Sequence, residues 1–274
     1  MVPSPSTQPL TGRLASLFSV DGKSALVTGG SRGIGLMIAR AYVEAGARVY
    51  ISSRNAAACA AVESELGQVG QCIAVPADLS KPDEVLRLAG LVAEREPSLD
   101  VLVNNAGATW GAPLDTFPAG GWDKVLGLNL TSVFFLTQAL LPQLRAAGTA
   151  ADPARIINIG SVDALHAQGG EVFEQETYPY SASKAALHQL TRVLAKRLGP
   201  EHITVNAIAP GPFESNMMAS TLAAYGDEIA QSSPLGRIGS PDDMAGAALF
   251  LASRAGAFVT GAVLPLDGGI VTTL

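Results

Sequence analysis

The stretch Thr28-Gly29-Gly30-Ser31-Arg32-Gly33-Ile34-Gly35 decides the fold of this 274-residue chain. It stands between an apolar run, Ala25–Thr28, and a helix-period segment, Ile34–Ala45, and therefore predicts a strand-to-helix turn. Its three spaced glycines allow a tight turn and a close approach of the backbone to a ligand. The helix that follows offers free N–H groups and the positive end of its dipole. We interpret the turn as a pyrophosphate site, with a purely structural glycine turn as the alternative.

The same alternation of apolar runs and helix-period segments continues to the end of the chain. Strands that are apolar throughout suit a parallel sheet covered on both faces. We predict one α/β domain with a Rossmann-type, doubly wound, parallel seven-stranded sheet over residues 21–274, preceded by a flexible tail at residues 1–20. The expected strands are Ala25–Thr28, Arg48–Ser52, Gln71–Val75, Val101–Val103, Arg155–Ile159, Thr204–Ile208 and Ala262–Leu266. The expected helices are Ile34–Ala45, Asn55–Leu66, Asp83–Arg95, Trp122–Leu144, Ser181–Leu198 and Asp242–Leu251.

Composition narrows the function classes. Apolar residues make up 48% of the chain and charged residues 15%, which supplies a sizeable core, and the net charge of −6 argues against a nucleic-acid partner. The two cysteines have no neighbours at metal-ligand spacing, so we expect reduced thiols and no metal. Neither a signal peptide nor an uninterrupted apolar run of membrane-spanning length is apparent, and we expect a cytoplasmic protein with no membrane partner.

The residues after the second expected strand indicate which dinucleotide binds. Enzymes that use NAD usually carry an acidic residue there, which bonds the ribose 2′-hydroxyl. This chain has Ser53 followed by Arg54, and Arg32 stands in the turn itself. Guanidinium groups bind phosphate through charge-assisted hydrogen bonds, so the pattern favours NADP(H) over NAD(H).

Tyr180 and Lys184 are the candidate chemical centre. Their i, i+4 spacing places the phenol and the ammonium on one helical face, where a nearby cation can lower the pKa of the Tyr180 hydroxyl. Ser161 follows the expected strand Arg155–Ile159 and can hold a substrate oxygen. Asn129 interrupts a long apolar helix, either as a helix-bending hydrogen bond or as an anchor for a water that relays protons to Lys184.

Taken together, these motifs resemble the short-chain dehydrogenase/reductase family over roughly residues 20–270. The matching elements are Thr28-Gly29-x3-Gly33-x-Gly35, Asp78-Leu79, Asn104-Asn105-Ala106-Gly107, Asn129, Ser161, Tyr180-x3-Lys184, Pro210-Gly211 and Leu266-Asp267-Gly268-Gly269. The resemblance implies a catalytic tetrad of Asn129, Ser161, Tyr180 and Lys184. Within the family, the chain is most similar to the 3-oxoacyl-acyl-carrier-protein reductases.

The resemblance also implies a set of NADP(H)-binding residues. Asp78 would bond the adenine, Asn105-Ala106-Gly107 would support the adenosine side, and Pro210 to Ser215 would hold the nicotinamide carboxamide. A homotetramer or homodimer would form through the two long helices. The predicted cofactor-binding residues are Gly29, Ser31, Arg32, Gly33, Ile34, Gly35, Arg54, Asp78, Leu79, Asn105, Ala106, Gly107, Tyr180, Lys184, Pro210, Gly211, Phe213 and Ser215.

One departure from the family pattern concerns the substrate. Ser161 and Tyr180 are 19 positions apart, several more than the family usually has, and the intervening segment carries Glu171, Glu174 and Glu176. An acidic rim disfavours a phosphate-bearing or acidic carrier. We expect NADPH-dependent reduction of a ketone, for which a 3-oxoacyl thioester is one candidate. The alternatives are NAD(P)-dependent oxidation of a secondary alcohol and a non-catalytic NADP-binding regulatory protein.

Overall fold

Seven parallel strands form one sheet in the order β3-β2-β1-β4-β5-β6-β7. This computed structural model describes residues 12–166, 177–215 and 218–273. All seven strands lie within two residues of the ranges expected from sequence. They are β1 Ser24–Thr28, β2 Arg48–Ser52, β3 Gln71–Ala74, β4 Val101–Asn104, β5 Ala154–Ile159, β6 Ile203–Pro210 and β7 Val263–Leu266.

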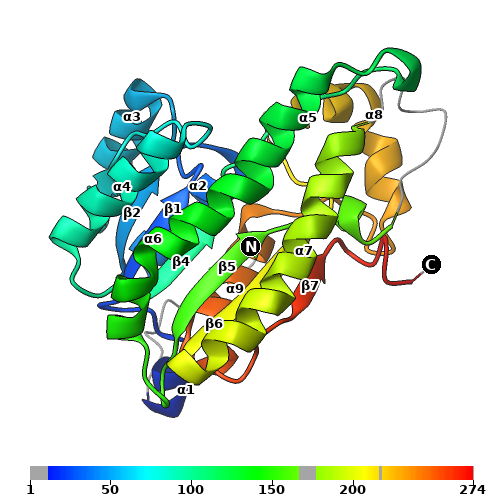
Figure 1. Ribbon diagram of the computed structural model, residues 1–274. Helices are drawn as coiled ribbons and strands as arrows, with labels where there is room; N and C mark the ends of the chain where they lie inside the picture. The colour runs from blue at the N-terminus through cyan, green and yellow to red at the C-terminus, as the bar shows by residue number, and fades with distance from the viewer. Residues whose placement is uncertain (1–11, 167–176, 216–217, 274) are drawn as a thin grey trace.

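Helices cover both faces of the sheet, as predicted, and each face has its own buried apolar cluster. On one face lie α2 (Gly33–Glu44), α3 (Ala56–Leu66) and α9 (Pro241–Ala252). On the other lie α4 (Pro82–Arg95), α6 (Ser132–Ala147) and α7 (Tyr178–Leu198), and Figure 1 shows α6 and α7 running side by side across it. Central strands are therefore buried on both sides, which explains their uninterrupted apolar sequences.

The strand order reverses beside β1, which pairs with β2 on one side and with β4 on the other. Consecutive crossovers therefore leave in opposite directions from β1 and β4, and a crevice opens beyond their carboxyl ends. Ligands of doubly wound sheets bind at such a switch point. The glycine-rich turn follows β1, so the topology places it at this crevice.

The long helix expected at Trp122–Leu144 is continuous but not regular. It consists of α5 (Ala119–Leu126), a π-helical turn η2 (Gly127–Thr131) and α6. By length and composition alone, Ala119–Ala147 could cross a membrane, with a mean hydropathy of 1.5 in its most apolar window, which the interrupted apolar runs in the sequence did not suggest. In the fold, 44% of that window is buried, and α6 packs against α4 and the sheet.

Two segments outside the expected helix ranges contain helices in the structure. The expected flexible tail at residues 1–20 contains a short helix, α1 (Gly12–Phe18), which contacts a 3-10 turn, η5 (Arg254–Gly256), and Val20 is buried. The segment after β6 contains a helix, α8 (Ala219–Ser232). Three further 3-10 turns are η1 Leu114–Thr116, η3 Val162–Ala164 and η4 Gly199–Glu201.

Candidate active site

The glycines of the turn after β1 are required by close backbone packing. A Cβ on Gly35 would lie 2.3 Å from the Gly29 carbonyl oxygen and 2.4 Å from Nδ2 of Asn105. A Cβ on Gly29 would lie 2.5 Å from the same amide nitrogen, and Gly29 has φ +67°. These separations exclude any side chain unless the turn moves, so the first strand-to-helix turn presents bare backbone to the crevice.

Thr28 and Asn105 fasten this turn to the end of β4. The Thr28 hydroxyl accepts hydrogen bonds from the backbone N–H groups of Asn105 and Ala106, both at 3.0 Å. The Asn105 amide donates to the Thr28 carbonyl at 2.8 Å. Ser31 donates to the Ser53 hydroxyl at 2.8 Å, which ties the turn to the end of β2. The carboxyl ends of three strands are thereby held together around the glycines.

Two arginines stand free at the same place. Arg32 is the N-cap residue of α2 and makes no side-chain cap, so the first N–H groups of that helix remain available. Arg32 and Arg54 are both exposed, and neither guanidinium has an ion-pair partner among the residues described. Bare backbone, a free helix N-terminus and two unpaired cations fit a pyrophosphate with an additional phosphate nearby.

Asp78 and Leu79 lie at the next strand end, after β3. The Asp78 carboxylate accepts hydrogen bonds from the hydroxyl and backbone N–H of Ser80, at 2.8 and 3.3 Å, and lies 4.0 Å from the Lys81 ammonium. Leu79 is buried in the apolar cluster of α4. Asp78 thus organises the start of α4 and remains partly exposed.

The segment after β6 lies partly against the turn and partly in the core. Gly211 packs on Asp267 so closely that a Cβ would lie 2.8 Å from the Asp267 Cβ. Phe213 is 3% exposed, pairs with Gly239 and belongs to the apolar cluster of α2 and α9. The ring, expected from the sequence among the cofactor-binding residues, therefore packs in the core. Ser215 lies against Gly33, with 3.3 Å between its Cβ and a Cβ built on that glycine.

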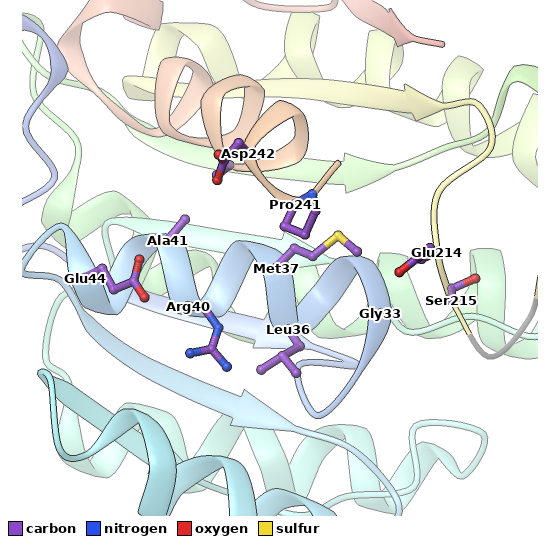
Figure 2. A pocket seen from close by; sticks show the side chains of 11 residues that line it. Gly33, Leu36, Met37, Arg40, Ala41, Glu44, Glu214, Ser215, Pro241 and Asp242 are labelled. Carbon is purple, nitrogen blue, oxygen red and sulfur yellow. The ribbon is translucent and has the colours of Figure 1, made fainter. Parts of the chain in front are cut away.

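A pocket of about 400 Å³ opens beside this contact, between α2 and the start of α9. Figure 2 shows Gly33, Leu36, Met37 and Arg40 along α2, with Glu214 and Ser215 facing Gly33 from the loop after β6. Glu44, Glu214 and Asp242 give its wall three carboxylates. Neither Tyr180 nor Lys184 lines this pocket, so it borders the outer side of the turn and is separate from the catalytic candidates.

The catalytic candidates meet where α7 passes the end of β5. Lys184 is 4% exposed and its Nζ donates to the Ile159 carbonyl at 2.6 Å. The same Nζ lies 5.6 Å from the centroid of the Tyr180 ring. Ser161 is 6% exposed, and its hydroxyl accepts a hydrogen bond from the backbone N–H of Asp163 at 3.1 Å. The fold thus brings Ser161, Tyr180 and Lys184 to one corner, as their sequence positions predicted.

Asn129 connects this corner to the end of β4. Its side-chain oxygen accepts from the Ala108 N–H at 2.8 Å, and its nitrogen donates to the Ala108 carbonyl and to the Ser183 hydroxyl, both at 3.0 Å. A Cβ on Gly107 would lie 3.3 Å from the Asn129 side-chain oxygen and 3.8 Å from the Lys184 Nζ. The π-helical turn that carries Asn129 is the type of distortion that often marks functional sites.

The electrostatics of the corner differ from the expectation for Tyr180. We expected Lys184 to lower the pKa of the Tyr180 hydroxyl, whereas burial raises that pKa to about 12. Burial likewise lowers the pKa of Lys184 to about 8. The Lys184 ammonium is directed at the Ile159 carbonyl and not at the phenol oxygen, which accounts for the difference.

Sequence reasoning missed several members of the site. Thr28 and Ser183 position Asn105 and Asn129, and Asp163 and His188 lie next to Ser161 and Lys184. His188 is 3% exposed, and neither ring nitrogen has a hydrogen-bond partner among the described residues. Its i+4 spacing from Lys184 is the sequence signal that places both side chains on one face of α7. The predicted acidic rim of Glu171, Glu174 and Glu176 lies outside the described residues.

The chain matches a family model described as Enoyl-(Acyl carrier protein) reductase over residues 29–271. It is similar to the rhamnolipids biosynthesis 3-oxoacyl-[acyl-carrier-protein] reductase of Pseudomonas aeruginosa, with 52% identity over 92% of this chain and 97% of the relative. It is also 35% identical to the gluconate 5-dehydrogenase of Gluconobacter oxydans, over 94% and 98% of the two chains.

Among solved structures, the fold resembles the Pseudomonas aeruginosa RhlG/NADP active-site complex. The TM-score is 0.89 with 51% sequence identity, and the match covers 93% of this chain and 99% of the other. The similarity in sequence and in fold therefore extends over more than nine-tenths of this chain.

Proposed function

Because the chain belongs to the short-chain dehydrogenase/reductase family, we propose that it reduces a ketone to a secondary alcohol with NADPH. The observation that carries the proposal is the convergence of Ser161, Tyr180 and Lys184 at the carboxyl end of β5, next to the glycine-rich turn. A proton donor, a hydroxyl for the substrate oxygen and a buried cation then lie beside a dinucleotide site. The relative and the solved structure that carry 3-oxoacyl reductase and NADP in their names support the same reaction class.

Each residue of the corner has its own role in the proposed ketone reduction. Bound NADPH supplies the hydride. Tyr180 holds a proton in its hydroxyl at physiological pH, since the pKa is raised, and donates it to the substrate oxygen. Ser161 orients that oxygen, and Lys184 places a positive charge behind the tyrosine. Asn129 fixes α7 against the end of β4 through Ser183 and Ala108.

The cofactor assignment rests on the turn. Gly29, Gly33 and Gly35 form a backbone cradle, and Arg32 and Arg54 supply the charge for the 2′-phosphate. Asp78 and the segment Asn105-Ala106-Gly107 border the adenosine side, and the segment from Pro210 to Ser215 closes the crevice from the opposite side.

The substrate and the direction form the finer part of the proposal. A 3-oxoacyl thioester is one candidate, and a hydroxylated keto acid is a second, which the relationship to a gluconate 5-dehydrogenase favours. Oxidation of the corresponding alcohols is the reverse of the same step. We further propose a cytoplasmic dimer or tetramer that buries the apolar groove between α6 and α7, where Phe134 and Leu194 are among the lining residues.

The test is the absorbance loss of NADPH with acetoacetyl-CoA, 5-ketogluconate and cyclic ketones, followed by the reverse assay with NADP and the matching alcohols. We expect turnover with at least one ketone and a clear preference for NADPH over NADH. Equal use of NADH would contradict the role given to Arg54. Full activity of a Tyr180→Phe variant would remove the mechanism, and no turnover of any carbonyl would support the non-catalytic alternative.

A further inference from the structure

Asp163 is a charged residue in the catalytic corner to which the tetrad assigns no role. It belongs to η3 (Val162–Ala164), a 3-10 helix of one turn that follows Ser161 at the end of β5. Its backbone N–H donates to the Ser161 hydroxyl at 3.1 Å. This hydrogen bond holds the backbone of Asp163 next to that hydroxyl. The turn packs against α7, the helix that carries both Tyr180 and Lys184.

The Asp163 carboxyl interacts with all three members of this corner. A side-chain hydrogen bond with Ser161 and the charge of Lys184 both act on it, and its own negative charge acts on Tyr180 and Lys184. Burial raises the pKa of Asp163 above its ordinary value, against the lowering effects of Lys184 and Ser161. The carboxyl group is therefore part of the same electrostatic unit as the proton donor.

The other groups around Tyr180 and Lys184 are neutral or lie further along α7. The end of β5 contributes the Ile159 carbonyl, which accepts from Lys184, and η2 contributes the uncharged Asn129. His188 on α7 has a pKa lowered to about 4 and carries no charge at neutral pH. Arg192, also on α7, acts on His188. In the described part of the chain, Asp163 is thus the carboxylate that acts on Tyr180 and Lys184.

We propose that Asp163, held beside Ser161 by η3 and packed against α7, is a positioning residue that keeps the Tyr180–Lys184 pair protonated to higher pH, so that Tyr180 still carries the proton that ketone reduction consumes. The proposal rests on the function proposed above, because it concerns the same pair. It adds a residue that neither the family motif nor the relatives' names assign.

The physical reason is the electrostatic effect of the Asp163 carboxylate on the protonation of Tyr180 and Lys184. Each proton that leaves the pair makes the corner more negative, whether the proton comes from the phenol or from the ammonium, and a fixed neighbouring carboxylate opposes both steps. Lys184 remains cationic although burial lowers its pKa, and Tyr180 remains a phenol that can donate. Removal of the Asp163 charge makes each proton loss easier, so every apparent pKa of the pair moves to lower pH.

The first test does not depend on any substrate. The titration of the Lys184 side chain is followed by NMR in the full-length protein labelled with ¹³C-lysine, with Lys184→Met used to assign the signal. We expect the midpoint in Asp163→Asn to fall by about one pH unit, the size of a charge several ångströms away in a partly buried site. Asp163→Ser removes the same charge with a different shape and is expected to give the same shift.

Two variants separate this effect from other causes. Asp163→Glu keeps the charge and is expected to restore the wild-type midpoint. Asp83→Asn removes one charge at an exposed position of α4, away from the corner, and is expected to leave the Lys184 midpoint unchanged. A wild-type midpoint in both Asp163→Asn and Asp163→Ser would overturn the proposal, and so would an equal shift in Asp83→Asn.

The second test uses turnover. The rate of acetoacetyl-CoA reduction by NADPH is measured against pH, and we expect its alkaline limb to begin about one unit lower in Asp163→Asn than in wild type. An unshifted limb, or loss of activity in both the Asn and Glu variants with NADPH still bound, would overturn the proposal. If wild type reduces no ketone while the Lys184 midpoint shifts as expected, the proposed function fails and the charge coupling stands.

Discussion

The glycine-rich turn (residues 29–35) and the candidate catalytic corner (Ser161, Tyr180 and Lys184) are built by different means. The turn comes from one contiguous stretch, and close backbone contacts require its glycines. The corner is assembled from β5, η3 and α7, and its behaviour depends on burial and charge. We therefore expect the turn to respond mainly to added side-chain volume. We expect the corner to respond mainly to the loss of a single charge or proton.

The largest expected effect is in the corner. Tyr180→Phe removes the proton donor while keeping the ring, and we expect kcat to fall by about 10²–10⁴-fold with little change in NADPH affinity. Steady-state rates and NADPH fluorescence titrations measure the two quantities. Tyr178→Phe, the same change two residues earlier in the ring cluster with Phe117, serves as the control and should lose far less activity. Comparable losses in both variants would show that the effect is not specific to the Tyr180 hydroxyl.

His188 tests whether a buried, uncharged histidine in the corner makes the free energy of unfolding depend on pH. Its pKa is lowered from 6.5 to about 4, so it is neutral when folded and gains a proton more readily when unfolded. Stability from this residue is present above pH 6.5 and is lost as the pH falls toward 4. At about 1.4 kcal/mol per pKa unit, the loss is about 3 kcal/mol.

Urea unfolding between pH 7 and 4 measures this loss. We expect His188→Leu to flatten the profile in that window. His202→Asn changes an exposed histidine at a left-handed position that asparagine tolerates, and it should leave the slope unchanged. A slope in His188→Leu as steep as in wild type would assign the pH dependence to other groups.

Gly35→Ala tests the steric character of the turn. The added Cβ would lie 2.3 Å from the Gly29 carbonyl oxygen, so the turn must shift at a cost of about 1–3 kcal/mol. We expect weaker NADPH binding and a lower unfolding midpoint, with the pH dependence of the rate unchanged. Gly90→Ala on α4, where a Cβ meets no atom within 4 Å, should instead stabilise the protein slightly. Normal NADPH affinity in Gly35→Ala would remove the steric argument.

The smallest expected effect is on cofactor choice. Arg54 is exposed, so its contact with a 2′-phosphate is screened, and Arg54→Ala should raise the KM for NADPH by about tenfold while leaving that for NADH nearly unchanged. The loss should shrink at high salt. Arg95→Ala, at the end of α4, is the matched control. An equal rise in KM for both cofactors would place Arg54 elsewhere than at the phosphate.

The sequence by itself determined the fold class, the strand ranges to within two residues and the glycine-rich turn between β1 and α2. Each depends on local rules, because glycine spacing and apolar periodicity constrain the backbone wherever the chain goes. It also identified Tyr180 and Lys184, since their i, i+4 spacing fixes a shared helical face.

Only the tertiary structure decided how the corner behaves. Burial, a property of the surrounding elements, raises the pKa of Tyr180, and Lys184 donates to the Ile159 carbonyl from a strand end distant in sequence. Asp163 and His188 reach the corner through the packing of η3 and α7, and Phe213 enters the core through its contact with Gly239. Desolvation and charge–charge distances arise when distant segments meet, so no local pattern encodes them.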